Sequence, residues 1–512
     1  MVTKILCQVT GLILFALLSA CTMVGPDFKP PESQVPEAWS TADDARVEST
    51  REEHANWWLE FNDPALNALI EKAHEGNLGL QIAGLRIYEA RAVLGRTKSF
   101  IYPQSQSIGA NASRVELSEN AEPVSNLPGP VRDNMDTGFS NYGVGLDALW
   151  EIDFWGRFRR GIEAADANLA GSIFNYDDML VTLTGEVAST YVLLRTLEER
   201  LAIAEKNVGV QQRGLDIADV RFRNGITTEL DVQQAKALLY NTESLIPLLN
   251  TGIEKAKHAL SLLLGQTPGQ LSEILSLSNG IPAGPTSIAA GVPGELLRRR
   301  PDVRRAEMLA ATQSAAIGVA KADLYPAFRL VGSVGYVADS VGDIFKGDSF
   351  SGVGGFGFMW KILNYGRLKN NVRIQDARFQ QLVAAYQLTV LAAAREVDDA
   401  LVAFLNTQKE VQLKDASAIA AVRSVDLAMT LYRDGVTNYT TVLDTQRIQL
   451  LQQDALVAAK SKEGLQLIAA YKALGGGWQI SEDSDYIPVK TKNEMLDRTD
   501  WGDLLESAKS VN

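Results

Sequence analysis

Two short stretches of the chain share an unusual pattern. Residues 222–236 read FRNGITTELDVQQAK, and residues 432–447 read YRDGVTNYTTVLDTQR. Gly225 and Gly435 stand 210 residues apart, with Arg and Thr in register on either side of them. Each stretch interrupts a helical pattern, because Gly suits the left-handed position that closes a helix and Thr or Asn suits the N-cap of the next one. We therefore predict two helical hairpin tips. Their candidate N-caps are Thr227 or Thr228 in the first tip and Thr437 or Asn438 in the second.

The 210-residue register extends far beyond the two tips. LWEIDFWGR at Leu149–Arg157 matches MWKILNYGR at Met359–Arg367. Upstream the displacement becomes 223 residues, so the first copy holds about 13 extra residues, and the Pro- and Asn-rich segment 116–134 accommodates them as a surface loop. A unit of this length is too long for a solenoid repeat. The chain is therefore a tandem duplication of two complete structural halves.

The composition excludes some classes of protein. The 512 residues include 49 Lys and Arg against 62 Asp and Glu, a formal net charge of −13, so a nucleic-acid role has no electrostatic support. Mean hydropathy is −0.04. Beyond the first 20 residues no run of 18 or more apolar residues occurs, which argues against a bundle of membrane helices. A membrane β-barrel is compatible with these values, because its strands alternate polar and apolar residues.

The N-terminus has the pattern of a bacterial lipoprotein signal. Lys4 precedes the apolar run ILCQVTGLILFALL, and the sequence LLSAC then ends at Cys21. This pattern resembles a lipobox, in which the peptide is cut before the Cys and the thiol is acylated. The next residue is Thr22 and not Asp, so the inner-membrane retention signal is missing and we expect the protein in the outer membrane. The alternative is an ordinary signal peptide followed by a chance Cys.

Glycine-rich alternating segments predict a β-hairpin in each half. YGVGLDALW at 142–150 places large apolar residues on one face and Gly or Asp on the other, and FSGVGGFGFMW at 350–360 repeats the pattern. Such strands suit a barrel in lipid, and a Gly-rich soluble hairpin is the alternative. Two hairpins supply four strands, which cannot close a barrel. Because lipid tolerates no open sheet edge, several chains would have to share one barrel.

Very long helices follow each hairpin, over about 157–222 and 367–432. Their apolar residues recur at spacings of three and four, as in a coiled-coil seam. At about 1.5 Å per residue each helix would span on the order of 100 Å, so these polar helices must cross water. Helical segments over 65–99 and 300–324 begin the two halves. Pro247 predicts a local kink in the helix that returns from the first tip.

Taken in order, these motifs resemble the TolC-like outer-membrane efflux factors, specifically the NodT-type lipoprotein branch that pairs with resistance-nodulation-division pumps. The matching motifs, between Cys21 and Trp478, are LLSAC, VGPDFKPP, NWWLEFNDPALNALI, DFWGR, RFRNGITTELDVQQA, RRRPDVRRAE, YRDGVTNYTTVLDTQR and YKALGGGW. The resemblance implies a mainly α fold with a membrane β-barrel. It implies a homotrimer whose chains share twelve strands, four per chain, joined to a long α-helical periplasmic barrel with an equatorial belt.

The same resemblance implies a function and its partners. The chain would be the exit duct of a tripartite efflux pump, working with a periplasmic adaptor protein and an inner-membrane resistance-nodulation-division pump. An outer-membrane channel for type I secretion or metal-ion efflux is the alternative. The implied organisation comprises a signal peptide (1–20), a lipidated extension (21–62), a first structural repeat (63–274), an equatorial linker (275–294), a second repeat (295–474) and an equatorial tail (475–512).

The resemblance also carries over the residues of a gate at the second tip. Tyr432 matches a tyrosine that ties the inner hairpin to neighbouring helices, and Asp231 matches an aspartate that receives its bond. Asp444 matches an acidic ring residue at the constriction, where three copies would favour cations, and Arg447 matches an arginine one turn along. The alternative is that these two simply pair at i,i+3 on a solvated face. Thr440 departs from the family's pattern, because close relatives place a larger apolar residue there.

Two other classes of protein compete with this interpretation. An enzyme has little support, because the three histidines His54, His74 and His258 share no ligand spacing and no catalytic or phosphate-binding motif occurs. We expect no cofactor and no metal, and we expect His74 at the surface. The GGG at 475–477 predicts a helix stop. A coiled-coil periplasmic scaffold is the second rival, and the paired Gly-aromatic hairpins argue against it.

Overall fold

The structure, a computed structural model, describes residues 23–32, 35–48, 50, 54–122, 124–480 and 485–505, without the side chains of 295–297. The predicted lipidation residue Cys21 lies outside these ranges. The chain divides into two compact units. The first combines Met1–Pro30, Glu89–Leu169 and Met308–Ala384, and the second combines Pro31–Tyr88, Ala170–Glu307 and Ala385–Asn512. Each unit therefore draws on both halves of the duplication.

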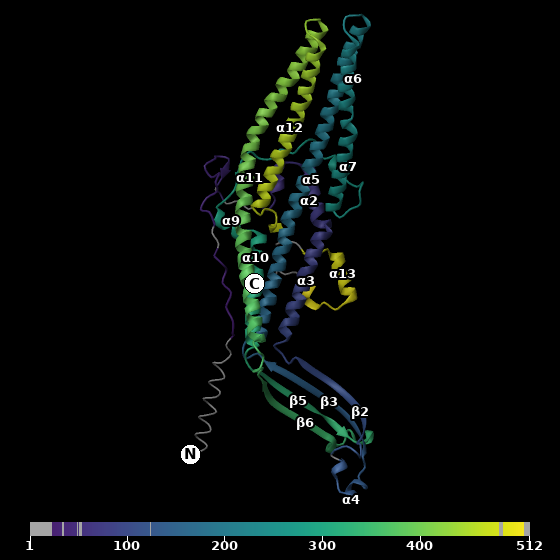
Figure 1. Ribbon diagram of the computed structural model, residues 1–512, viewed down its shortest axis with the longest axis vertical. Coiled ribbons are helices and arrows are strands. Elements are labelled where there is room, and N and C mark those ends of the chain that lie inside the picture. The colour runs from purple at the N-terminus through teal and green to yellow at the C-terminus, as the bar shows by residue number, and fades with distance from the viewer. Residues whose placement is uncertain are drawn as a thin grey trace. The chain divides into compact units, whose positions relative to one another are not determined.

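The first unit contains a four-stranded antiparallel sheet. Its strands lie side by side in the order β2 (Ser105–Glu116), β3 (Gly138–Ile152), β5 (Ala327–Ala338) and β6 (Phe350–Met359) (Figure 1). The central β3–β5 pair joins one hairpin from each half of the duplication. The prediction of two strands per half and four per chain is confirmed. Strands β2 and β6 form the two outer edges of this sheet.

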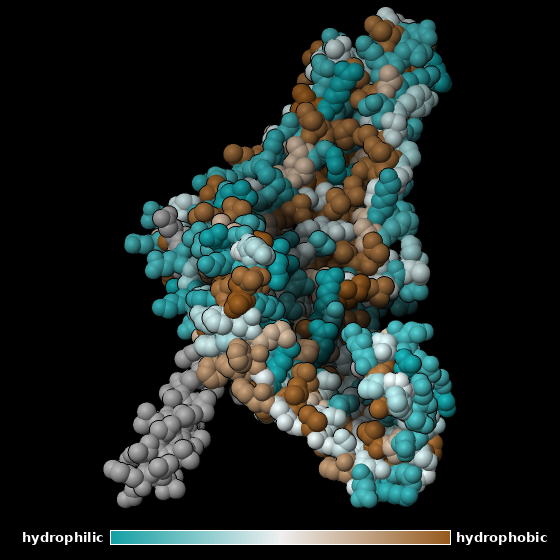
Figure 2. Space-filling view, turned by 60° about the horizontal axis from the view of Figure 1, so that its bottom comes forward, coloured by the Kyte–Doolittle hydropathy of each residue, from teal (hydrophilic) through white to brown (hydrophobic). Residues whose placement is uncertain are grey.

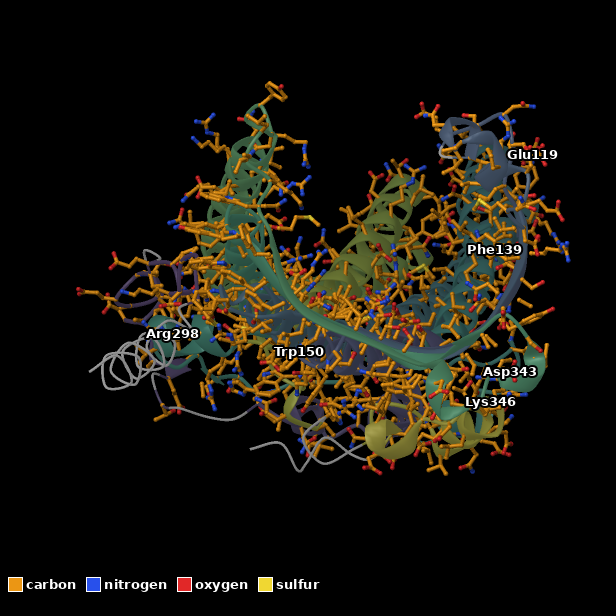
Figure 3. All side chains as sticks on the ribbon, turned by 90° about the horizontal axis from the view of Figure 1, so that it is seen from below. Glu119, Phe139, Trp150, Arg298, Asp343 and Lys346 are labelled. Atoms are coloured by element: carbon orange, nitrogen blue, oxygen red, sulfur yellow. The ribbon has the colours of Figure 1, made fainter. Side chains whose placement is uncertain are left out.

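The strand register gathers the large apolar residues on one face of the sheet. Trp150 lies opposite Leu330, and Leu330 lies opposite Phe356. Because side chains alternate along a strand, Gly145 and Gly335, which also pair, fall on the other face. Figure 3 shows the labelled Phe139 and Trp150 toward opposite ends of β3, and the connection residues Glu119, Asp343 and Lys346 lie at the end away from Trp150.

The connections between the strands contain short helical turns. Where the sequence predicts a surface loop over 116–134, the structure forms η2 (Val124–Asn126) and α4 (Gly129–Arg132), and the Val124 side chain is buried. The β5–β6 connection contains η3 (Val341–Asp343) and η4 (Gly347–Ser349).

The DFWGR segment turns the chain from β3 into the long helix α5 (Arg157–Arg223). The Asp153 carboxylate accepts the backbone N–H groups of Phe158 at 3.0 Å and Arg159 at 2.9 Å. A carboxylate at this place satisfies helix N–H groups and complements the positive end of the helix dipole. Gly156 has a φ of 76°, which lets the backbone turn between the strand and the helix.

The long helices keep the register of the duplication. Helices α5 and α11 (Arg367–Arg433) have 67 residues each, and both ends are displaced by 210 residues, from 157 to 367 and from 223 to 433. Likewise α10 (Pro301–Ala322) begins 223 residues after α3 (Leu78–Ser99), from 78 to 301. The two displacements read from the sequence are therefore confirmed in the helix boundaries.

The two return helices differ, and Pro247 explains the difference. In the first half the return path breaks at Ser244 into α6 (Glu229–Glu243) and α7 (Leu245–Leu263). In the second half α12 (Tyr439–Ala473) is continuous over 35 residues, with Val457 at the position equivalent to Pro247. Proline removes a helical hydrogen bond and its ring contacts the preceding turn. The predicted kink is thus a break in the helix.

The sequence-based expectation of one helix over 65–99 is wrong. The segment forms α2 (Pro64–Gly76) and α3, separated at Asn77. The Asn77 side chain caps α3 by accepting the N–H of Leu80 at 2.9 Å, and it donates to the carbonyl of Leu263 at 2.8 Å. A side chain at Gly76 would lie 2.4 Å from the carbonyl oxygen of Leu264, so backbone crosses backbone there. This tertiary contact splits the helix.

Short elements complete the second unit. Strand β1 (Val47–Glu48) pairs in parallel with β4 (Ile288–Ala289). The remaining helical elements are η1 (Trp57–Phe61), α8 (Ser272–Leu275), α9 (Pro293–Arg299), α13 (Val489–Arg498) and η6 (Gly502–Leu505). Among the residues that the structure describes, no helix is both long enough and apolar enough to cross a membrane.

Two histidines contact other parts of the second unit, and one of them is less exposed than expected. His74, expected at the surface, is partly buried, its Nε2 lies 2.8 Å from Thr184 Oγ1, and its ring meets Trp58 edge-on. Burial lowers the pKa of His74 to about 4. The buried His54 has its Nε2 2.7 Å from the carbonyl of Ala289. The expectation for His74 was wrong because the segment around Trp58 covers α2, a contact that helical periodicity does not reveal.

Candidate functional site

Both tips close their first helix with the same backbone motif. Gly225 has a φ of 70° and Gly435 a φ of 80°. In each tip the N–H after the Gly bonds the carbonyl five residues earlier, at 2.9 Å from Ile226 to Arg221 and at 2.8 Å from Val436 to Leu431. This is the Schellman arrangement, which requires a left-handed residue that Gly adopts without strain. The prediction of Gly-closed helix ends is confirmed.

The return helices begin where the N-cap residues were predicted. Thr228 precedes α6 and Asn438 precedes α12. The Asn438 side chain accepts the N–H of Thr441 at 3.2 Å, whereas Thr228 makes no capping bond with its side chain. Asp231, in the first turn of α6, adds a negative charge where the helix dipole favours one.

Arg221, near the end of α5, connects the first tip to the second. Its Nη1 donates to the carbonyl oxygen of Tyr432 at 2.6 Å and to that of Arg433 at 3.3 Å. Its guanidinium also lies 4.7 Å from the centre of the Tyr432 ring. Tyr432 and Arg433 end α11, where carbonyls lack a partner within the helix and a cation is favoured. One side chain of α5 therefore binds the end of α11.

Tyr432 makes a second connection, to the start of α6. Its Oη donates to Asp231 Oδ2 at 3.4 Å. Asp231 Oδ2 also accepts a hydrogen bond from Thr227 Oγ1. The Tyr432 side chain is only 2% exposed, and burial raises the pKa of its phenol, so the hydroxyl is a proton donor at neutral pH. The structure thus places Tyr432 and Asp231, two of the sequence-predicted gate residues, within hydrogen-bonding distance.

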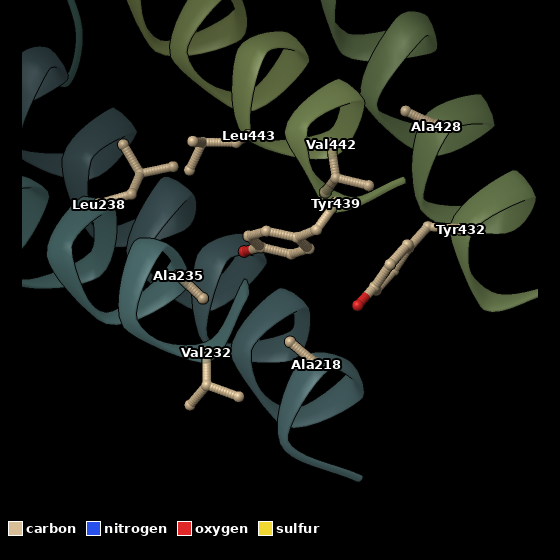
Figure 4. Packing of buried hydrophobic residues seen from close by; sticks show 9 residues of the cluster. All are labelled: Ala218, Val232, Ala235, Leu238, Ala428, Tyr432, Tyr439, Val442 and Leu443. Atoms are coloured by element: carbon tan, nitrogen blue, oxygen red, sulfur yellow. The ribbon is translucent and has the colours of Figure 1, made fainter. Parts of the chain in front are cut away.

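A small apolar core lies behind these polar contacts. Tyr432 and Tyr439 meet edge-on with ring centres 5.3 Å apart. They pack among side chains from four helices, α5, α6, α11 and α12, as Figure 4 shows. The nine buried residues are Ala218, Val232, Ala235, Leu238, Ala428, Tyr432, Tyr439, Val442 and Leu443. The two tips are therefore packed together and not merely adjacent.

The three remaining gate candidates lie exposed on the first turns of α12. The Thr440 side chain faces solvent in the single chain. Asp444 Oδ1 lies 3.8 Å from Arg447 Nη1, and the two side chains are 61% and 59% exposed. An ion pair this long and this exposed contributes little to stability. The i,i+3 pairing that the sequence offered as an alternative is present, and it leaves both charges open to the medium.

Sequence reasoning missed Arg221 and Tyr439. A signal for Arg221 was available in the duplication itself, because the tips differ at the residues that connect them. Leu431 stands at the position equivalent to Arg221, and Thr441 stands at the position equivalent to Asp231. Residues that break the register of a duplication are candidates for contacts between its two copies.

The chemistry of this site is that of hydrogen bonds and exposed charges. In the described ranges no group of three or more His, Cys, Asp or Glu side chains is placed to hold a metal ion. The arrangement can hold two helical hairpins together through side chains that separate without breaking a covalent bond.

Comparison with known proteins identifies the class of this fold. The family model "Outer membrane efflux protein" matches residues 69–266 and 292–476, which together cover most of the chain. The chain belongs to this family. It is accordingly a channel protein of the outer membrane that serves efflux.

Individual relatives agree with this assignment. The chain is 31% identical over 449 residues to the pyoverdine export outer membrane protein OpmQ of Pseudomonas putida, covering 87% of this chain and 92% of that protein. It is 29% identical to the toluene efflux pump outer membrane protein TtgI of Pseudomonas putida, over 92% of this chain and 99% of that protein. Among solved structures, the outer-membrane channel OprN superposes with a TM-score of 0.82 at 31% identity, over 89% of this chain and 100% of that one.

Proposed function

We propose that the protein is the exit duct of a tripartite efflux pump and works as a homotrimer. Its partners would be a periplasmic adaptor protein and an inner-membrane resistance-nodulation-division pump, and its cargo small molecules that the pump delivers. The names of the relatives support this reading, because they include outer membrane proteins of a solvent efflux pump, a toluene efflux pump and a cation efflux system. The two stretches matched by the family model support the proposed repeats over 63–274 and 295–474.

The observation that carries the proposal is the sheet with two open edges and one apolar face. The outer strands β2 and β6 have 12 and 10 residues, enough to cross a bilayer when tilted. In lipid an open edge leaves backbone groups without partners, so each edge needs a strand from another chain. Three chains with four strands each would close a barrel of twelve.

Exposed apolar side chains on the helices also support assembly. Figure 2 shows hydrophobic residues gathered along the helical part of the second unit, with hydrophilic residues to either side. Large apolar side chains that are more than half exposed in the single chain include Leu248, Leu262, Leu388, Leu413 and Leu451. Clusters of this kind on a single chain mark contacts with other chains.

Native mass spectrometry of the detergent-extracted protein tests the assembly. We expect a complex of three copies, and we expect the adaptor and the pump to co-purify after mild cross-linking. The physical reason is that four strands leave two edges open in each chain. A stable, folded monomer in detergent would contradict the shared barrel and with it the duct.

We propose in addition that Cys21 is acylated. The structure supports the position of such an anchor, because the chain after it is held in place within the first unit. The buried Arg160 donates to Asp27 at 2.8 Å and to the carbonyl of Val24 at 3.3 Å, and Val24 N–H donates to the carbonyl of Trp155 at 3.1 Å. Trp155 lies in the turn that follows β3, so the anchor would emerge beside the end of the sheet.

Mass spectrometry of the purified protein tests the anchor. The mature N-terminal peptide should begin at Cys21 with the mass of a lipid-modified residue, and Cys21→Ala should lose that modification. An unmodified N-terminus at another residue would refute the anchor. The trimer proposal would survive this result, because the strands hold the chain in the membrane independently.

We propose finally that the two tips form the gate of the duct. Arg221 and Tyr432 hold the end of α11 against α5 and α6 in the resting state. Asp444 and Arg447 would line the constriction of the trimer, with Thr440 beside them. The exposure of all three in the single chain supports this placement. Opening would require partners that offset the contacts between the tips.

A further inference from the structure

Helix α12, which carries the proposed gate residues, packs against α5 along a row of polar side chains that are buried or partly buried. Asn207 Nδ2 donates to Gln453 Oε1 at 2.7 Å. Nearer the tip, a side chain added at Gly214 would meet Gln446 Nε2 at 3.1 Å. The helices are antiparallel, so these two contacts fix their register and place Gln211 of α5 level with Gln449 of α12. We call the row Asn207, Gln211, Gln446, Gln449 and Gln453 the polar seam.

Three residues of the polar seam are buried with amide atoms that have no partner among the described protein residues, although Gln446 Nε2 reaches Met429 Sδ at 3.8 Å. Gln211 and Gln446 are each 1% exposed and Gln449 is 3% exposed. Within the part of the chain that the structure describes, both polar atoms of Gln211 and the Oε1 atoms of Gln446 and Gln449 make no hydrogen bond to protein. These atoms are already buried inside one chain, so a neighbouring protomer does not reach them. Buried amides in this condition disfavour the packing that buries them.

The duplication shows that this fold does not require amides here. The positions equivalent to Gln211 and Gln449 in the other half are Ala421 and Leu239. Both are apolar and buried, at 6% and 3% exposure. An apolar residue therefore fits the helical positions of Gln211 and Gln449, whereas the positions equivalent to Asn207, Gln446 and Gln453 hold the polar Ser417, Lys236 and Glu243.

The polar seam ends next to an ion pair between α5 and α12. Arg200 of α5 and Asp454 of α12 form a two-bond ion pair, with Nε to Oδ1 at 2.5 Å and Nη2 to Oδ2 at 2.8 Å. Beyond it, Lys462 of α12 pairs with Glu410 of α11 at 2.9 Å. The segment 439–453, which carries Thr440, Asp444 and Arg447, thus lies between this attached part of α12 and the tip.

We propose that the polar seam is the plane along which the gate segment of α12 separates from α5, and that Gln211 and Gln449 position the gate by making its closed packing weak. When the helices separate, water hydrates the amides and their hydrogen-bonding capacity is met. In the closed state the tip contacts of Arg221 and Tyr432 oppose this tendency. The inference rests on the proposed gate. It adds that the burial of Gln211 and Gln449, well away from the tip, favours opening.

The test replaces the amides by apolar side chains of similar length. Gln211→Met combined with Gln449→Met should favour the closed state, because Met is buried at no hydrogen-bonding cost. In planar bilayers, adding this pair to the tip variant Arg221→Ser/Tyr432→Phe should lower its open probability roughly tenfold. Alone, the pair should raise the Tm of the trimer and reduce efflux-dependent drug resistance at unchanged trimer levels. Gln212→Met is the matched control, since Gln212 is exposed and its side chain donates to Asp216 within its own helix.

Each outcome decides between the two proposals. A seam variant that opens more readily, or that has the Tm and resistance of the wild type, would overturn the role of the seam while the tip variant still tests the gate. If the tip variant does not open the channel, the proposed gate fails. The Tm and the resistance of the seam variant alone then still decide whether the amides weaken the contact of α12 with α5.

Discussion

The double variant Arg221→Ser/Tyr432→Phe is expected to conduct in the resting state, in which the proposed gate would keep the wild-type channel closed. Arg221 loses two bonds to the end of α11 and its contact with the Tyr432 ring, and Tyr432 loses its bond to Asp231. Together these contacts stabilise the closed tips by about 2–4 kcal/mol per chain. The closed-to-open ratio of the tips in each chain should therefore fall roughly 30- to 1000-fold. Single-channel recordings in planar bilayers measure this change directly.

A second readout and a matched control make this prediction specific. Cells that carry the double variant without the pump should admit large antibiotics that wild-type cells exclude. Arg223→Ser is the control, because Arg223 lies two residues from Arg221 but forms its ion pair with Asp219 on its own helix. If the double variant conducts like the wild type while Arg223→Ser does too, the contacts between the tips do not hold the gate, and the tips are only helical turns.

The structure identifies Arg221, and not Arg447, as the arginine that connects the two tips. The resemblance carried over Arg447 as a residue of the gate, yet among the described residues of one chain its ion pair is with Asp444, at 3.8 Å, and its side chain stays exposed. Arg221 makes the connection between the hairpins instead. The resemblance supplied Asp231 of the first tip as a partner of Tyr432, but it did not supply Arg221, whose contact with Tyr432 joins residues 211 positions apart in the sequence.

Local patterns in the sequence predicted most of the fold. The ends of α5 and α11, the two glycine turns and the N-caps at Thr228 and Asn438 follow from helix periodicity and capping chemistry, which act over a few residues. The break at Asn77 did not follow from these rules. It depends on the approach of Leu264 to Gly76, and no pattern around residue 77 contains that information.

In the polar seam, too, a feature of the site depends on tertiary packing and not on local sequence. Gln211 and Gln449 stand at ordinary helical positions, and their residue type alone does not distinguish them from the exposed Gln212. Their burial arises only because α5 and α12 pack in a particular antiparallel register, which Asn207 and Gln453 define. Comparison of the two halves of the duplication would have marked the site, since Ala421 and Leu239 replace the amides there.

Asp444→Ala is expected to reduce the cation preference of the channel about fivefold. In the proposed trimer three Asp444 side chains face one axis, and a unit charge at about 4 Å in water attracts a passing cation by about 1 kcal/mol. The substitution also leaves Arg447 without its partner, so three unpaired positive charges remain near the constriction. Reversal potentials in a salt gradient measure the permeability ratio. The difference should shrink as salt rises, because both side chains are exposed to the medium.

Two further variants decide whether the three Asp444 side chains of the trimer form a charged ring, or whether each only pairs with Arg447 on the surface. Arg447→Ala should shift selectivity the opposite way, toward cations, because it exposes the full charge of Asp444. Asp434→Ala removes an equal charge from the same tip, but Asp434 pairs with Arg433 outside α12, so selectivity should change little. If Asp444→Ala and Asp434→Ala behave alike, Asp444 and Arg447 form only the i,i+3 pair on a solvated face. If only Asp444→Ala and Arg447→Ala move the ratio, and in opposite directions, these charges line the path of the ions.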